Sequence, residues 1–262
     1  MNSSDPLVGS KRRLARAKLH SRELKRGLNA FVLSNPYRHV VQPDPDGIHE
    51  IHKLKARRKV LPLSFVDIAT DAIENLRSAL DLAVYAIAEK VAITDSSVKL
   101  SKVYFPFCDV QENFSSRITG CCPNFPTPIC NLLGTFKPYE GGDDILWSIG
   151  EFAKKTKHHG LTSVAMNFTS GHMVGRGIQP SFPLKWDRSN NEGVLCRSRL
   201  NTKVQFKLHG TFRIGLGDVP VVAHKNLGGL VHRMTGIVEG IIAAIGAEAK
   251  RIGLFSSGPH SK

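Results

Sequence analysis

One stretch of the chain, residues 75–81 (Asn-Leu-Arg-Ser-Ala-Leu-Asp), places an arginine and an aspartate four residues apart at the edge of an apolar stripe. Side chains four residues apart meet on one helix face, so Arg77 and Asp81 form either part of a polar pocket or a structural clamp. A guanidinium stabilises a developing phosphorane, and a neutral imidazole accepts a proton near pH 7. Arg77 beside His158, with Tyr85 assisting, would therefore suit metal-independent RNA cleavage.

The structural alternative pairs Arg77 with Asp81 or Glu74 and leaves the histidines to cap a helix. His158 and His159 are adjacent, so they point in different directions on a helix and make a poor chelating pair. The cysteines include no repeated Cys-x-x-Cys pair, and the sequence holds neither a phosphate-binding glycine-rich loop nor a Gly-x-Ser-x-Gly elbow. We therefore expect no metal and no cofactor.

The net charge of +14 is unevenly distributed, because residues 1–60 and 161–262 are basic whereas residues 61–160 are slightly acidic. Clustered Lys and Arg displace the counterions of a polyanion, so this asymmetry favours RNA or another polyanion as partner; a solvated basic surface explains it equally well. The residues expected to contact nucleic acid are Arg12, Arg13, Arg16, Lys203 and Lys207. Those expected to complete a binding site around Arg77 are Asp81, Asn75, Lys157 and His159.

The ends of the chain bear on its location in the cell. Basic residues near the N-terminus are not followed by an apolar run of signal-peptide length. The longest apolar run near the C-terminus, Gly240 to Ala247, is shorter than the ~20 residues that a spanning helix needs. The sequence therefore predicts a cytoplasmic protein that does not enter a membrane.

The spacing of apolar residues predicts the elements that must position these side chains. Steps of three and four predict helices over residues 11–32, 64–91, 143–157 and 226–252. The turn residues at 43–47 (Pro-Asp-Pro-Asp-Gly) predict a small hairpin, and residues 101–143 read as loops with short helical turns. An alternating pattern after residue 161 predicts an antiparallel β region.

The expected fold class is therefore α+β, a bundle of about four main helices with a small hairpin and a C-terminal antiparallel β region. We expect one domain over residues 11–255, made of a helical core (11–160 and 226–252) and the β region (161–223). Residues 1–10 and 256–262 are expected to be flexible tails.

Three short segments also carry a resemblance: residues 75–82, Pro138-Tyr139 and Lys157-His158-His159. Their order resembles that in a group of uncharacterised bacterial proteins with an Asn-Leu-Arg-Ser-Ala-Leu-Asp-His helix, a Pro-Tyr step and a Lys-His-Arg step. The Arg-x4-His pattern of that group is similar to the motif of HEPN domains, helical bundles often found in RNA-cleaving toxins and defence proteins. Those enzymes pair such residues across a dimer without a metal, so the resemblance implies a helical core and a homodimer.

This chain departs from the motif at two positions. Leu82 occupies the position of the histidine, and leucine cannot transfer a proton; His159 stands in place of the later arginine. We therefore expect a HEPN-like protein with a nucleic-acid-binding or defence role and with lost or altered nuclease chemistry. Two alternatives stay open: a metal-independent endoribonuclease that uses Arg77 and His158, and a structural or partner-binding protein without a ligand.

Overall fold

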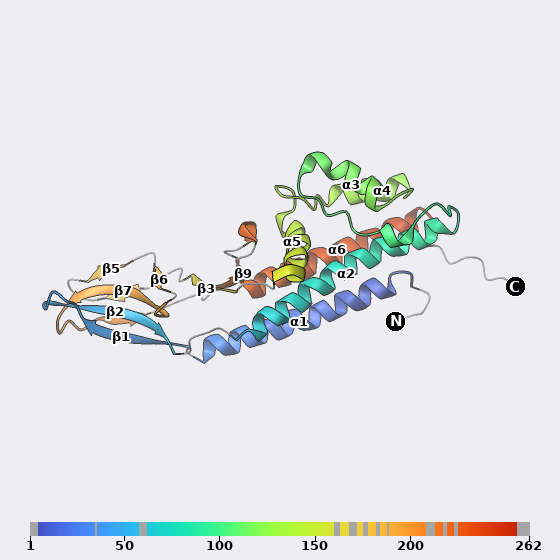
Figure 1. Cartoon of the computed structure of the whole chain (residues 1–262). Helices are drawn as coiled ribbons and strands as arrows, with labels where there is room; N and C mark the ends of the chain where they lie inside the picture. The colour runs from blue at the N-terminus through green and yellow to red at the C-terminus, as the bar shows by residue number, and fades with distance from the viewer. Residues whose placement is uncertain are drawn as a thin grey trace.

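The computed structural model describes residues 5–34, 36–57, 62–159, 163–167, 172–174, 178–181, 184–187, 189–207, 213–216, 219–222 and 225–255. Within these ranges the chain forms α-helices and antiparallel β-sheets, so the expected α+β class is confirmed. The helices form an elongated bundle, and the largest sheet extends beyond one end of it (Figure 1).

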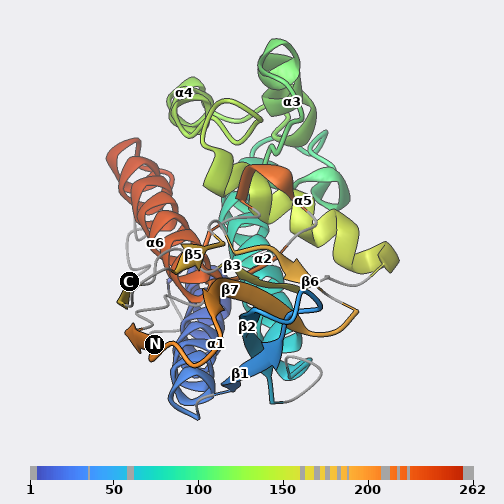
Figure 2. The ribbon, with the colours of Figure 1, turned by 90° about the vertical axis from the view of Figure 1, so that its left-hand side faces the viewer.

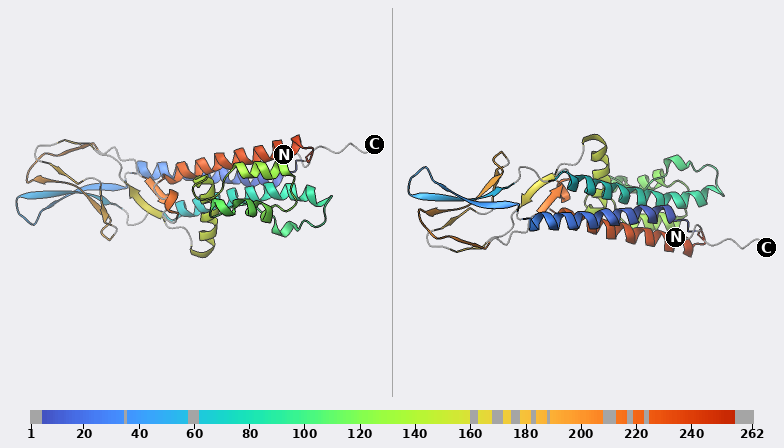
Figure 3. Two further views of the ribbon diagram at one scale, coloured as in Figure 1. Left: turned by 90° about the horizontal axis from the view of Figure 1, so that it is seen from above. Right: turned by 90° about the horizontal axis from the view of Figure 1, so that it is seen from below.

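Three long helices run side by side along the bundle: α1 (Val8–Leu33), α2 (Ser64–Ala92) and α6 (Leu227–Arg251) (Figures 1 and 3). A shorter helix, α5 (Asp144–His159), crosses them. The four helices expected from the sequence are therefore present. α1 begins before residue 11 because Leu7 and Ser10 are buried, and the Ser10 hydroxyl donates to the Ala79 carbonyl of α2 at 2.7 Å.

The segment between α2 and α5 is loop interrupted by short helices, as expected. These are the 3-10 turns η1 (Leu100–Lys102) and η2 (Gln111–Asn113) and the helices α3 (Phe114–Cys121) and α4 (Thr127–Thr135). Figure 2 shows α3 and α4 together on one side of the bundle. All five cysteines are free thiols.

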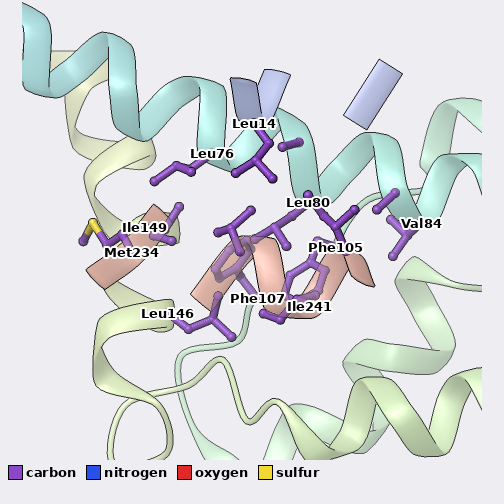
Figure 4. Close-up of a cluster of buried hydrophobic side chains, with 14 of the residues drawn as sticks. Leu14, Leu76, Leu80, Val84, Phe105, Phe107, Leu146, Ile149, Met234 and Ile241 are labelled. Atoms are coloured by element: carbon purple, nitrogen blue, oxygen red, sulfur yellow. The ribbon is translucent and has the colours of Figure 1, made fainter. Parts of the chain in front are cut away.

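The hydrophobic core lies where α2, α5 and α6 meet the loop after η1 (Figure 4). Leu76 and Leu80 of α2 are completely buried, and Phe105 in that loop is buried with them. Burying a leucine or phenylalanine side chain contributes about 1.5–3 kcal/mol, so this apolar stripe is what holds α2 at the centre of the bundle.

Helix α6 is long and apolar enough to span a membrane by length and composition, alone among the described helices. Half of its most apolar window is buried inside the protein. Its buried stripe includes Val231, Met234, Val238 and Ile245, which belong to the same core as α2. A core helix of a bundle therefore accounts for the apolar character of α6.

The largest sheet joins the N-terminal hairpin to the C-terminal β region. The strands β1 (Tyr37–Pro43) and β2 (His49–Ala56) form the hairpin, and β2 also pairs with β7 (Glu192–Arg199). The short strands β5 (Gln179–Pro180) and β6 (Trp186–Asp187) pair with the other edge of β7. The hairpin and the antiparallel region are confirmed, and the pairing between them is a finding that the strand patterns left open.

Two smaller antiparallel pairs and one 3-10 turn complete the described β region. β3 (Ser163–Asn167) pairs with β9 (Arg213–Leu216), and β4 (His172–Val174) pairs with β8 (Gln205–Lys207). The turn η3 (Pro220–Val222) leads to α6, whose first turn is capped by the Asn226 side chain.

A chain of polar side chains crosses the large sheet from β1 to β7. His39 Nε2 lies 2.9 Å from His52 Nδ1, and His52 Nε2 lies 3.0 Å from Ser198 Oγ, which donates to Glu50 Oε1 at 3.1 Å. His52 and Ser198 are buried. Each of these contacts needs one proton. Since Ser198 donates to the Glu50 carboxylate, it accepts from His52, and His52 in turn accepts from the exposed His39.

This row of hydrogen-bonded side chains makes the stability of the folded protein sensitive to acid. Partial loss of hydration at its ring, followed by the charge of His52, lowers the pKa of His39, while Glu50 opposes the shift. The unfolded chain therefore takes up a proton more readily, so the stabilisation is complete above about pH 6.5 and is lost as the pH falls below it. We expect urea unfolding midpoints to fall from about pH 8 to about pH 5.5, and His39→Gln to flatten that dependence. An equally steep decline in His39→Gln would contradict this assignment.

Candidate functional site

Arg77 lies on the face of α2 that meets the loop after η1. Its Nε donates to Asp81 Oδ2 at 3.2 Å, and Asp81 Oδ1 accepts the Phe105 backbone N–H at 2.9 Å. The guanidinium carbon lies 4.3 Å from the centre of the Phe107 ring, within the range of a cation–π contact. Arg77 therefore pairs with Asp81 rather than Glu74, and the two side chains clamp this loop onto α2.

Phe107 connects Arg77 to the middle of α5. Phe107, on which the guanidinium lies, also packs against Gly150, where an added Cβ would be 2.8 Å from the ring. His158 follows Gly150 by about 12 Å along the helix axis, at roughly 1.5 Å per residue. The side chain of His158 lies outside the described residues. Tyr85 is half-buried on α2, and it also follows Arg77 by about 12 Å along the helix axis.

A groove of about 610 Å³ runs between α1 and α2. Asn75 and Leu82 line it, whereas Arg77 is turned away from Asn75 by about 200° about the helix axis, at roughly 100° per residue. Leu82, which stands at the histidine position of the motif, and Arg77 therefore lie on different faces of α2. The residues that line this groove are Gly9, Arg12, Arg13, Arg16, His20, Asp71, Asn75 and Leu82.

The periodicity of α1 turns its arginines toward the groove. Leu14 and Ala17 are buried against the bundle. The residues next to this buried face of α1 therefore lie at the edge of the bundle. Arg12, Arg16 and His20 recur every four residues and therefore form one row along the helix. Sequence reasoning found the arginines but missed His20, although this four-residue step is visible in the sequence.

The groove carries an excess of positive charge. Arg12 and Arg16 make no ion pair with any residue that the structure describes, and the Arg13 guanidinium lies 3.4 Å from the Asn75 side-chain oxygen. Asp71 is the one carboxylate among the described lining residues. Three guanidiniums facing a single carboxylate attract an anion, and the planar fork of each one suits a phosphate group.

The neighbouring lysines of α1 differ from these arginines, because each has its own acidic partner. Lys11 lies 2.6 Å from Asp5, and Lys18 lies 2.6 Å from Glu239 of α6. Surface pairs of this kind contribute about 0–1 kcal/mol, but they reduce the charge available to a ligand. The available charge on α1 is therefore concentrated in the groove and in the more C-terminal basic residues.

His20 adds a polar group at one end of the groove. Its side chain is 14% exposed, and its Nδ1 atom is buried without a hydrogen bond, 3.8 Å from the Glu23 carboxylate. The described lining of the groove thus combines three guanidiniums with one imidazole and one carboxylate.

The other predicted binding residues lie elsewhere or outside the described side chains. Lys203 is exposed beyond the end of β7, where the Leu200 N–H donates to the Ile48 carbonyl in the hairpin turn. That turn is at the end of the sheet farthest from the bundle, so Lys203 is not brought together with Arg12 (Figure 1). The side chains that lie outside the described residues are those of Lys157, His159 and Lys207.

The described residues include no cluster of three or more His, Cys, Asp or Glu side chains that could hold a metal ion. The polar side chains in the described lining of the groove are those of arginine, histidine, aspartate and asparagine. No family model, no curated protein and no solved structure matches this chain.

Proposed function

We propose that this protein binds the phosphate backbone of single-stranded RNA in the groove between α1 and α2 and leaves the RNA intact. The observation that carries the proposal is the row of Arg12, Arg13 and Arg16 along the groove, opposed by Asp71 alone among the described lining residues. RNA, a defence role and assembly as a homodimer rest on the resemblance of residues 75–82 to HEPN-like proteins.

The groove favours backbone contacts over base contacts. Its described lining contains no Phe, Tyr or Trp, so it lacks the large aromatic platforms on which unstacked bases lie in many single-strand-binding proteins. Guanidinium–phosphate contacts carry little sequence information. The expected binding is therefore weakly sequence-dependent and strongly dependent on salt.

The endoribonuclease alternative requires Arg77 to face the scissile phosphate. Its Nε is engaged by Asp81 and its guanidinium lies on Phe107, which supports a structural role instead. Leu82 supplies no proton-transfer group in the groove. The contacts of Arg77 therefore favour binding of RNA without cleavage.

Fluorescence anisotropy with a labelled single-stranded RNA tests the proposal. Each phosphate contact releases a counterion, so we expect the logarithm of the association constant to fall linearly with the logarithm of salt concentration, with a slope of about −2 for three contacts. The same RNA should stay full-length on a denaturing gel after incubation in EDTA. Binding that ignores salt, or no binding at all, would sink the proposal; cleavage abolished by Arg77→Ala would favour the endoribonuclease.

A further inference from the structure

A second pocket, separate from the α1–α2 groove, lies between α3, α5 and the loop after η1. Its volume is about 450 Å³, within the range of small-molecule sites. The described residues that line it are Tyr104, Phe107, Cys108, Asp109, Asn113, Ser116, Arg117, Gly120 and Lys154. It shares no described lining residue with the groove.

Two contacts orient the exposed Arg117 side chain at this pocket. Its Nε donates to the Phe107 carbonyl at 3.0 Å, and its guanidinium carbon lies 5.2 Å from the centre of the Tyr104 ring. No carboxylate in the described part of the chain forms an ion pair with it. Burial raises the pKa of the neighbouring Cys121 thiol, so that group stays neutral and does not compensate the charge.

The other cation of the pocket, Lys154, lies between two carboxylates. Lys154 Nζ lies 2.8 Å from Asp109 Oδ1 and 2.6 Å from Glu151 Oε1. Lys154 and its two carboxylates together carry one negative charge, and Arg117, beside Phe107 and Tyr104, is the one cation of the described lining without a carboxylate partner. A ligand that pairs with Arg117 alone carries one negative charge, and the Tyr104 ring offers its body an apolar contact.

We propose that this pocket binds a small organic monocarboxylate, with the carboxylate paired to the Arg117 guanidinium. Two oxygens of a carboxylate match two N–H groups of an arginine fork. A phosphate monoester carries a charge of about −1.5 to −2 near pH 7, and its excess charge would face Asp109. The charge of the pocket therefore favours the carboxylate.

Gly120 provides a way to close the pocket without disturbing the core. It lies in α3, and a Cβ added there would have no atom within 4 Å, so a larger side chain extends into open space. Gly120→Phe should fill the pocket and leave Arg117 in place. Gly236→Phe is the matched control, because Gly236 of α6 is equally open and lies outside this pocket.

The test is a chemical-shift titration of the whole protein with benzoate, its neutral analogue benzamide, and inorganic phosphate. We expect saturable shifts with benzoate in the natural protein and in Gly236→Phe. Loss of those shifts in Gly120→Phe, and at least about tenfold weaker binding in Arg117→Gln, would support the site. Equal binding of benzamide, tighter binding of phosphate, unchanged benzoate binding in Gly120→Phe, or no saturable shift would each overturn it.

Discussion

Replacing Arg12, Arg13 and Arg16 together by glutamine should weaken RNA binding on the order of 100-fold at low salt, if each exposed guanidinium–phosphate contact contributes about 1 kcal/mol. These side chains line the α1–α2 groove, and the same change should remove about 2 from the salt slope. Glutamine forms helices well, so α1 should persist. Anisotropy titrations of the RNA at several salt concentrations measure both effects.

A matched variant distinguishes binding in the groove from attraction by the overall charge of α1. Arg22, Lys25 and Arg26 are exposed on the same helix and are not among the described residues that line the groove, so replacing them by glutamine removes the same charge. We expect a loss of less than about tenfold from this control, because distant surface charges are largely screened by salt. Equal losses in the two variants would mean that α1 attracts RNA through its overall charge and that the groove is not a site.

The second large effect concerns stability. Asp81→Ala should lower the free energy of unfolding by about 2 kcal/mol, chiefly because the buried Phe105 N–H loses its acceptor. The lost ion pair with Arg77 contributes about 0–1 kcal/mol of this, since both side chains are partly exposed. Urea unfolding followed by circular dichroism measures the change.

Asp81→Asn is the control for the clamp. Asparagine keeps an oxygen that can accept the Phe105 N–H but removes the charge that faces Arg77, so the expected loss is under about 1 kcal/mol. RNA affinity should stay unchanged in both variants, because Asp81 does not belong to the groove. A fall in RNA affinity without a fall in stability would place Asp81 in a binding site.

The helices and the clamp could be predicted from local patterns. The apolar stripe of α2 predicted its extent, and the four-residue spacing of Arg77 and Asp81 offered their ion pair as one of the alternatives, because both depend on contacts within one helix. The third partner, the Phe105 N–H, could not be predicted. It comes from a loop without a periodic pattern, and its position depends on how the core packs.

The groove shows a different limit. The sequence singled out Arg12, Arg13, Arg16 and Asn75 but assigned them to separate sites, because nothing local reveals which face of α1 lies beside which face of α2. In the structure these four residues are neighbours, and Arg77 lies on the other side of α2. Helical periodicity places residues on a face, whereas tertiary packing decides which faces meet.

The pairing of β2 with β7 has a consequence for biosynthesis. Lys53 and Glu192 lie 2.6 Å apart across these strands and are separated by 139 residues of sequence. During translation the hairpin must wait for most of the polypeptide to emerge before its inner edge is covered, and an uncovered strand edge is prone to intermolecular pairing. Closing so long a loop has an entropy cost, so β2 gains its second partner, β7, later than its hairpin partner, β1.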